Sequence, residues 1–311
     1  MKQNLRIVAL FPPGLLTLAV FAITSSGFAQ LTQREIEENS IFSSDDLTLP
    51  VFVPESENDD DLGVQLALRP EEKYDPFNLY GNVGWYFTDN AAVTETNRLE
   101  DSFLNASATL TYLPIIRGNL YGEATIRENT FRYNENSDLD FDTIDLGSGF
   151  VYVIRGLGDL AVFARYNYGT YLDPNDGWGQ LYENHSIQAG AYKPWILKRN
   201  HFLQVSYVSD VSLEADPGFA QRDDHSVTLS YRWTPIRKFR TDFYVRSSYL
   251  DYRENSRDDW NTSAGATLTY NLTPNLRLSS SVMYTHNQSN FDGGDYEVWV
   301  PGFQLGGIIQ F

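Results

Sequence analysis

An alternation of apolar and polar residues recurs in segment after segment from residue 77 onward, and it constrains the fold of this chain more than any other feature. Successive side chains of a β-strand point to opposite faces, so each alternating segment predicts a strand with one apolar and one polar face. The clearest segment places Val227, Leu229, Tyr231 and Trp233 on one face and Ser226, Thr228, Ser230 and Arg232 on the other. This repetition predicts an all-β protein.

Twelve such segments occur, and the connections between them alternate in length. The segments begin near Asn78, Phe103, Leu120, Thr143, Leu160, Asn184, Phe202, His225, Phe239, Asn261, Leu276 and Val298. Five connections are short turns, namely Leu113–Asn119, Arg155–Asp159, Pro194–His201, Thr234–Lys238 and Leu272–Asn275. The six others are longer and acidic, namely Asp89–Asp101, Asn134–Asp142, Asp173–Glu183, Asp210–Asp224, Arg253–Asp259 and Asn287–Glu297. Strict alternation of short and long connections is typical of outer-membrane barrels.

Two architectures accommodate strands of this kind, a soluble β-sandwich and a membrane-spanning β-barrel. A sandwich does not require short and long connections to alternate. The polar faces here are too regular for a buried core, and the apolar faces are too extensive for water. Lipid outside and a hydrated lumen inside accommodate both faces. We therefore predict a transmembrane antiparallel up-and-down β-barrel of twelve strands over residues 77–311.

The last segment carries the residues expected to close such a barrel. Its apolar face holds Phe303, Leu305, Ile309 and Phe311, and the sequence ends on this last aromatic residue. This ending resembles that of bacterial outer-membrane β-barrel proteins. The stretches Leu250–Asp259, Tyr270–Leu278 and Ser289–Glu297 resemble the closing hairpins of bacterial β-barrel porins. The resemblance implies an outer-membrane location, a closing role for the last strand and recognition by the barrel assembly machinery. It implies no particular substrate.

The N-terminal residues predict export. Lys2 and Arg6 precede an apolar stretch over residues 7–23, and Gly27-Phe28-Ala29 offers small residues where a signal peptidase cleaves. We therefore expect a signal peptide over residues 1–29. The chain has no cysteine, so this is not a lipoprotein signal. No later apolar run is long enough for a transmembrane helix.

Residues 30–76 differ from the rest of the chain and are predicted to form an irregular acidic arm. They hold 13 acidic and 3 basic residues, a net charge of −10 within a chain total of −18. Most of the short turns, by contrast, are basic and carry Arg117, Arg155, Lys198, Arg199, Arg237 and Lys238. The arm is a solvated linker, a plug that folds onto these turns or enters the lumen, or a docking segment for a periplasmic partner. The negative charge argues against nucleic acid as a partner.

The sequence offers little for catalysis or for metal binding. His185-Ser186 and His225-Ser226 are adjacent pairs, whose side chains point to opposite faces of a strand and cannot form a dyad. The stretch Asp173–Gly177 departs from the spacing of a calcium loop. The acidic loops either bind Ca²⁺ or Mg²⁺ weakly at a lipopolysaccharide surface or remain hydrated. We expect no catalytic residue, no cofactor and no dedicated metal site, with outer-membrane lipid and lipopolysaccharide as the surroundings.

Charged residues on the polar parity are the remaining candidates for a functional site. They are expected to face the lumen because a lipid-facing Arg or Lys costs roughly 2–4 kcal/mol at mid-bilayer. The candidates are Glu123, Arg127, Arg165, Arg232, Arg240, Asp242, Arg246 and Arg277. Their excess of arginine fits either structural ion pairs or a ladder that selects anions. Phe163 and Tyr244 share this parity and are expected to fill part of a narrow bore.

These features favour an outer-membrane channel for the passive passage of small solutes or ions. One alternative is a non-conducting structural barrel whose acidic arm docks a periplasmic partner. Another is a lipid-modifying barrel enzyme, which requires a histidine-serine pair assembled across strands. Conductance in a lipid bilayer separates the first two functions, and activity on phospholipid or lipid A identifies the third.

Overall fold

The computed structural model describes residues 75–253 and 256–311. The predicted signal peptide and all but the last two residues of the predicted acidic arm lie outside these ranges. We refer to the two ends of the molecule as the short-turn end and the long-loop end, after the connections that each end carries. Helical structure is limited to four short 3-10 turns, η2 (Ser137–Leu139), η3 (Arg155–Leu157), η4 (Pro174–Asp176) and η5 (Gly218–Ala220), among the described residues.

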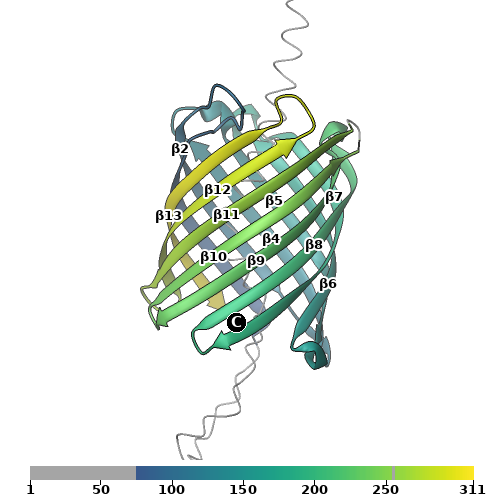
Figure 1. Cartoon of the computed structure of the whole chain (residues 1–311), viewed down its shortest axis with the longest axis vertical. Helices are drawn as coiled ribbons and strands as arrows, with labels where there is room; N and C mark the ends of the chain where they lie inside the picture. Colours follow the sequence, from purple (N-terminus) through teal and green to yellow (C-terminus); the bar gives the residue numbers. More distant parts are fainter. Residues whose placement is uncertain (1–74, 254–255) are drawn as a thin grey trace, which may run out of the picture.

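Twelve long antiparallel strands form a closed wall (Figure 1). They are β1 (Phe77–Thr88), β2 (Asp101–Tyr112), β4 (Leu120–Tyr133), β5 (Phe141–Ile154), β6 (Leu160–Asp173), β7 (Gly179–Lys198), β8 (His201–Asp216), β9 (Arg222–Ile236), β10 (Phe239–Tyr252), β11 (Arg257–Asn271), β12 (Leu276–Ser289) and β13 (Tyr296–Gln310). A three-residue strand, β3 (Ile115–Arg117), pairs with β4 inside the turn that follows β2.

The first and last strands close the barrel. β1 pairs with β2 on one side and with β13 on the other, where the register runs from Asn78 opposite Gln310 to Tyr86 opposite Gly302. Phe77 and Phe311 extend this seam by two backbone hydrogen bonds of 3.1 and 3.0 Å. Each of the twelve long strands therefore has a hydrogen-bonded neighbour on both sides, as a closed barrel requires.

All twelve predicted strands are present, and the predicted barrel is confirmed. Several predicted connections were too long. β8 continues to Asp216 and β9 begins at Arg222, so the predicted loop Asp210–Asp224 shrinks to residues 217–221. β7 likewise reaches Lys198, and the predicted turn Pro194–His201 shrinks to residues 199–200. The charged residues of these regions remain in strands because backbone pairing continues beyond the apolar part of the wall.

The outward faces form an apolar band bordered by aromatic rings. Ring pairs at the long-loop end are Tyr249–Trp260 and Tyr284–Trp299, and ring pairs at the short-turn end are Phe77–Phe311 and Phe239–Tyr270. Aliphatic side chains such as Leu229 and Val245 lie between these levels and are about half exposed. Aromatic girdles of this kind mark the two membrane–water interfaces of a barrel. Within the described ranges, no helix has the length and apolar character needed to cross a membrane.

The inward faces pack aromatic rings over glycines of neighbouring strands. The buried rings of Tyr86, Phe163 and Tyr244 lie directly opposite Gly302, Gly190 and Gly265, respectively. A Cβ built on any of these glycines lies 2.2 to 2.7 Å from an atom of the facing ring. The missing side chain therefore lets each ring lie flat along the wall. Phe163 and Tyr244 fill part of the interior, as their parity in the sequence predicts.

Candidate functional site: the barrel lumen

The eight charged residues proposed from the sequence all lie on the inward parity of their strands. Inward positions are recognised as buried residues that alternate with exposed ones, as in β10, where Asp242 and Tyr244 are buried and Phe243 and Val245 are exposed. Glu123 and Asp242 are buried, and the six arginines are partly buried, namely Arg127, Arg165, Arg232, Arg240, Arg246 and Arg277.

An ion pair between Glu123 and Arg165 spans two strands of the wall. Glu123 Oε1 on β4 lies 3.2 Å from Arg165 Nη1 on β6. Gly149 of β5 stands between them in register, opposite Glu123 on one side and opposite Arg165 on the other. Because glycine has no side chain, the arginine crosses β5 without obstruction. The guanidinium also lies 4.4 Å from the ring centroid of Phe163, a cation–π contact that shields it further.

Asp242 on β10 joins two arginines from neighbouring positions. Its carboxylate accepts one hydrogen bond from Arg232 Nε on β9 and another from Arg240 Nε, each 2.6 Å long. One carboxylate between two guanidiniums gives this trio a net charge of +1. Farther toward the long-loop end, Arg246 Nη2 lies 3.5 Å from Asp224 Oδ2 on β9. β9 and β10 therefore form a charged wall.

The other two arginines make different contacts. Arg127 on β4 lies directly opposite Asp145 on β5 in the strand register. Arg277 lies over the ring of Tyr80, with its guanidinium carbon 4.7 Å from the ring centroid. Arg165, Arg232, Arg240 and Arg246 thus have carboxylate contacts of 4.0 Å or less. This geometry is that of structural ion pairs rather than of a ladder made of arginines alone.

Sequence reasoning missed several acidic residues that also lie on inward faces. They are Asp145, Asp210, Asp224 and Asp259. Three of them fell at the ends of predicted loops because their surroundings are acidic. The signal that identifies them is parity alone: Asp224 continues the inward series Ser226, Thr228 and Ser230 of β9. The lumen therefore carries both signs of charge.

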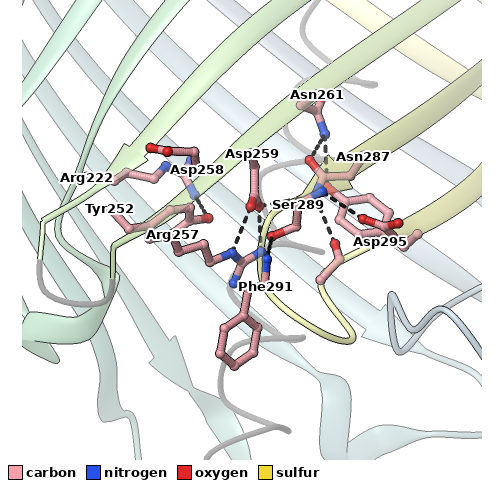
Figure 2. A network of polar contacts seen from close by, with 12 residues as sticks. Arg222, Tyr252, Arg257, Asp258, Asp259, Asn261, Asn287, Ser289, Phe291 and Asp295 are labelled. Atoms are coloured by element: carbon pink, nitrogen blue, oxygen red, sulfur yellow. Dashed lines mark hydrogen bonds and ion pairs between the residues drawn. The ribbon is translucent and has the colours of Figure 1, made fainter.

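A polar network at the long-loop end is built around Asp259 (Figure 2). Arg257 donates hydrogen bonds from Nε and Nη2 to the Asp259 carboxylate at 2.9 and 2.5 Å, and Asn287 Nδ2 donates to it at 3.1 Å. Asn287 also donates to the carbonyl of Gly294, which ties the loop after β12 to the wall. Asn261 donates to Asn287 Oδ1 at 3.2 Å. The buried charges of Arg257 and Asp259 are therefore fixed at this mouth.

The strands β1, β2 and β4 contribute a neutral polar wall. Asn82, Ser107 and Asn129 lie side by side in cross-strand register, with Asn105 next along β2, and all four are buried. Both amide atoms of Asn82 and the side-chain oxygens of the other three have no hydrogen-bond partner among the described residues. At this level the inward face of the three strands is therefore polar and carries no net charge.

The loop of residues 89–100 folds inward at the long-loop end. Ala91 and Val93 are buried in an apolar cluster that includes the inward rings of Tyr86 and Phe103. Asn90 is fully buried and holds the loop, because its amide nitrogen donates to the carbonyls of Thr94 and Glu297 at 2.8 and 2.9 Å. The side-chain oxygen accepts from Thr94 N at 3.1 Å. This connection adds an apolar lining to the mouth.

Two aspartates organise the neighbouring connection between β4 and β5. Asp101 accepts hydrogen bonds from the backbone N–H of Glu135 and of Asn136, and from the Asn136 side chain at 2.7 Å. Asp140 accepts from the backbone N–H of Tyr133 at 2.7 Å, and burial raises the pKa of the Asp140 carboxyl above its ordinary value. Side-chain to backbone hydrogen bonds therefore fix this part of the rim.

The closing strand directs its apolar residues outward. Phe303, Leu305, Ile309 and Phe311 are each 46 to 59% exposed on the lipid-facing side. Gln304 lies on the opposite face, where it is buried and accepts a hydrogen bond of 2.9 Å from the Tyr86 hydroxyl. Gln310 donates to Asn78 across the β1–β13 seam at 2.7 Å. One face of β13 therefore contacts lipid, and the other faces the lumen.

The four histidines contact tyrosines or glutamates on outward faces. His185 lies 2.5 Å from the Tyr166 hydroxyl and 3.2 Å from Glu183. The other contacts are His225–Tyr207 at 3.2 Å, His201–Tyr231 at 2.5 Å and His286–Glu297 at 3.5 Å. Ser186 and Ser226 are buried on the inward face. As parity predicted, each of these serines points away from the histidine that precedes it.

The sequence matches no protein-family model and no curated protein, whereas the fold is similar to solved outer-membrane barrels. An outer-membrane channel from Pseudomonas putida F1 has a TM-score of 0.52 at 11% identity, with 77% of this chain and 99% of that chain covered. The NanC porin has a TM-score of 0.41 at 13% identity, covering 75% and 99%. The KdgM porin, solved with disordered oligogalacturonate, has a TM-score of 0.39 at 7% identity, covering 72% and 97%.

The protein is an outer-membrane β-barrel. Its closed wall of twelve strands, its apolar outer band and its two aromatic girdles suit a lipid environment, and the likeness to the Pseudomonas channel shows the same fold. The predicted fold and location are confirmed. Because such barrels place their short turns in the periplasm, the short-turn end faces the periplasm and the long-loop end faces outward.

Proposed function

We propose that this protein is a porin-like channel for the passive passage of small polar solutes or ions. The observation that carries the proposal is a polar strip along the inward face of β9. The strip consists of Arg222, Asp224, Ser226, Thr228, Ser230, Arg232 and Thr234, and it reaches from one end of the strand to the other. A non-conducting barrel, whose interior is filled with side chains, gains little stability from charged residues inside it. Buried charge pairs stabilise a protein no better than apolar groups of similar volume.

The two apolar clusters of the interior draw their members mostly from strands other than β9 and its neighbours. One apolar cluster near the long-loop end includes Phe131 and Phe141, and another near the short-turn end includes Val151, Phe163 and Tyr192. None of the described members of either cluster comes from β8, β9 or β11, except Val208, which packs at the margin of the second. We infer that a hydrated solute follows β9 and avoids the parts of the interior that the two apolar clusters fill.

Bilayer recordings with paired variants test this function. Purified wild-type protein is expected to give stepwise conductance. Thr228→Trp places a bulky ring on the polar strip and is expected to lower the single-channel conductance several-fold. Leu229→Trp is the matched control, because the adjacent side chain points to lipid, and it is expected to leave conductance unchanged. Folded wild-type protein without conductance steps contradicts the proposal and favours the non-conducting docking barrel.

A further inference from the structure

Two neighbouring turns at the periplasmic end gather four exposed cations. Lys198 and Arg199 lie where β7 turns into β8, and Arg237 and Lys238 lie where β9 turns into β10. The turns are neighbours because β8 pairs with β9. We call these four residues the basic patch. Among the described residues, none of the four side chains forms an ion pair with a carboxylate, so their charge is available to an anion outside the protein.

The rest of the short-turn end carries much less positive charge. The turn after β2 holds Arg117, and the turn after β5 holds Arg155 together with Asp159. The turn between β11 and β12 holds no charged residue. The cations of this end are therefore concentrated on the arc of the wall from β7 to β10, in a chain whose net charge is −18.

The basic patch lies where the wall meets the lipid headgroups. Trp195 and Trp233, in strands that lead to the two turns, are 41 and 40% exposed on the outward face. Lys238 Nζ lies 5.9 Å from the ring centroid of Tyr270, which belongs to the aromatic girdle at this end. Because such girdles mark the membrane–water interface, the cations are within reach of lipid phosphates in the periplasmic leaflet.

Apolar side chains accompany the cations in the same two hairpins. Leu197 directly precedes Lys198 and is 55% exposed, and Ile236 directly precedes Arg237 and is 60% exposed. A small soluble anion gains nothing from these neighbours, whereas a phospholipid offers both a phosphate and acyl chains. Cations, aromatic rings and exposed aliphatic side chains together therefore fit an amphiphilic anion.

The outward face of the same wall has the opposite charge at its other end. Asp223, Asp251 and Asp258 point outward near the long-loop end and lie directly opposite one another on β9, β10 and β11. The outward charge thus changes sign along these strands. Attraction for an anionic lipid is therefore limited to the periplasmic leaflet.

We propose that the basic patch binds anionic phospholipid headgroups of the periplasmic leaflet, with the phosphate on the cations and the acyl chains against the aromatic and aliphatic side chains beside them. This inference does not depend on whether the barrel conducts. Cations at a membrane surface attract anionic lipids, and the attraction weakens as salt screens exposed charges. A several-fold preference for anionic over zwitterionic lipid is expected around this arc at low salt.

Tryptophan fluorescence reports on the lipid at this position. Of the six tryptophans, only Trp195 and Trp233 lie at the short-turn end. The full chain is reconstituted in phosphatidylcholine vesicles with a minor fraction of brominated phosphatidylglycerol or brominated phosphatidylcholine, since bromine quenches a ring that it contacts. Subtracting the signal of a Trp195→Phe, Trp233→Phe variant isolates the two rings. Their quenching by the anionic lipid is expected to exceed that by the zwitterionic lipid several-fold in low salt and to lose this excess in high salt.

Matched substitutions identify the cations responsible. Arg199→Gln with Arg237→Gln removes two charges of the basic patch and is expected to lower the preference for phosphatidylglycerol at least two-fold. Arg117→Gln with Arg155→Gln removes two charges from exposed positions elsewhere at the same end and is expected to preserve the preference. Heat-modifiable migration on a denaturing gel verifies that the variants are folded.

Three results overturn the proposal. The first is a wild-type protein that shows no preference for phosphatidylglycerol in low salt. The second is an equal loss of preference in the two arginine variants. The third is a loss of preference when inorganic phosphate replaces chloride at matched ionic strength, which indicates a site for soluble anions instead of lipid.

Discussion

Arg165 and Glu123 are joined by a contact of 3.2 Å although a whole strand, β5, separates the strands that carry them. The exposed fractions of the two side chains are 19% and 4%, so neither charge is well hydrated. A buried ion pair of this kind contributes little to the free energy of unfolding compared with apolar side chains of similar volume. Each of its two charges, however, depends on the other for neutralisation. Gly149 is what makes the contact sterically feasible, since it is the residue that the arginine passes over.

Removing the carboxylate of this pair is expected to destabilise the barrel. Glu123→Gln leaves the Arg165 guanidinium shielded without its counter-charge, which predicts a loss of roughly 3 kcal/mol in the free energy of unfolding. Urea unfolding of the protein in lipid vesicles measures this loss of stability. Glu128→Gln is the matched control, because Glu128 is exposed on the outward face of the same strand and is expected to change stability little. Equal effects of the two substitutions contradict the prediction.

Filling Gly149 is expected to be more damaging than filling a nearby glycine. A Cβ at Gly149 lies 2.3 Å from the Ala164 carbonyl oxygen and 2.6 Å from Arg165 Cα, and backbone atoms cannot rotate away. A Cβ at Gly147, on the same inward face, meets the side-chain oxygen of Asn167 at 3.2 Å and Thr125 Cβ at an ordinary contact distance of 3.8 Å. Gly149→Ala therefore predicts a loss of about 1–3 kcal/mol in unfolding free energy. A smaller loss than that of Gly147→Ala runs against this explanation.

The shared carboxylate of Asp242 is expected to influence ion selectivity. Asp242→Asn removes one negative charge between Arg232 and Arg240, so the lumen becomes more attractive to anions. The reversal potential under a salt gradient is expected to shift toward the anion limit. Asp251→Asn removes the same charge from an exposed position on the same strand and serves as the control. Heat-modifiable migration on a denaturing gel verifies that both variants are folded. An unchanged reversal potential in the first variant contradicts the prediction.

The amide of Asn90 is expected to hold the inward loop in place. Asn90→Ala removes hydrogen bonds to Thr94 and to the Glu297 carbonyl, and no other described side chain replaces them. Amide hydrogen exchange at Ala91 and Val93 is expected to accelerate at least several-fold, because the loop opens more often. Glu95→Ala, an exposed change in the same loop, is the control. Exchange rates that match between the two variants rule out this anchoring role.

Local alternation predicted much of the fold but not the contacts inside it. The period of two located the twelve long strands, because successive side chains of a strand point to opposite faces. It did not locate the three-residue strand β3, which lies inside the predicted turn Leu113–Asn119. The pairing of Glu123 with Arg165 depends on register across two neighbouring strands, which local alternation does not determine. The acidic stretch around Asp210 and Asp224 predicts a loop, because such stretches favour loops in water, whereas both residues lie in strands. Here the strands continue past the lipid, where charge no longer opposes strand formation.

The seam between β1 and β13 joins Asn78 to Gln310, residues separated by 232 positions in the sequence. Contacts of such long range form late in folding. Closing the intervening chain costs conformational entropy, and the hydrogen bonds of the seam offset this cost only when all the other strands are aligned. Until that moment β1 presents an open edge to any strand that meets it, including one from another copy of the protein. The last step of folding is therefore also the step that ends the risk of aggregation.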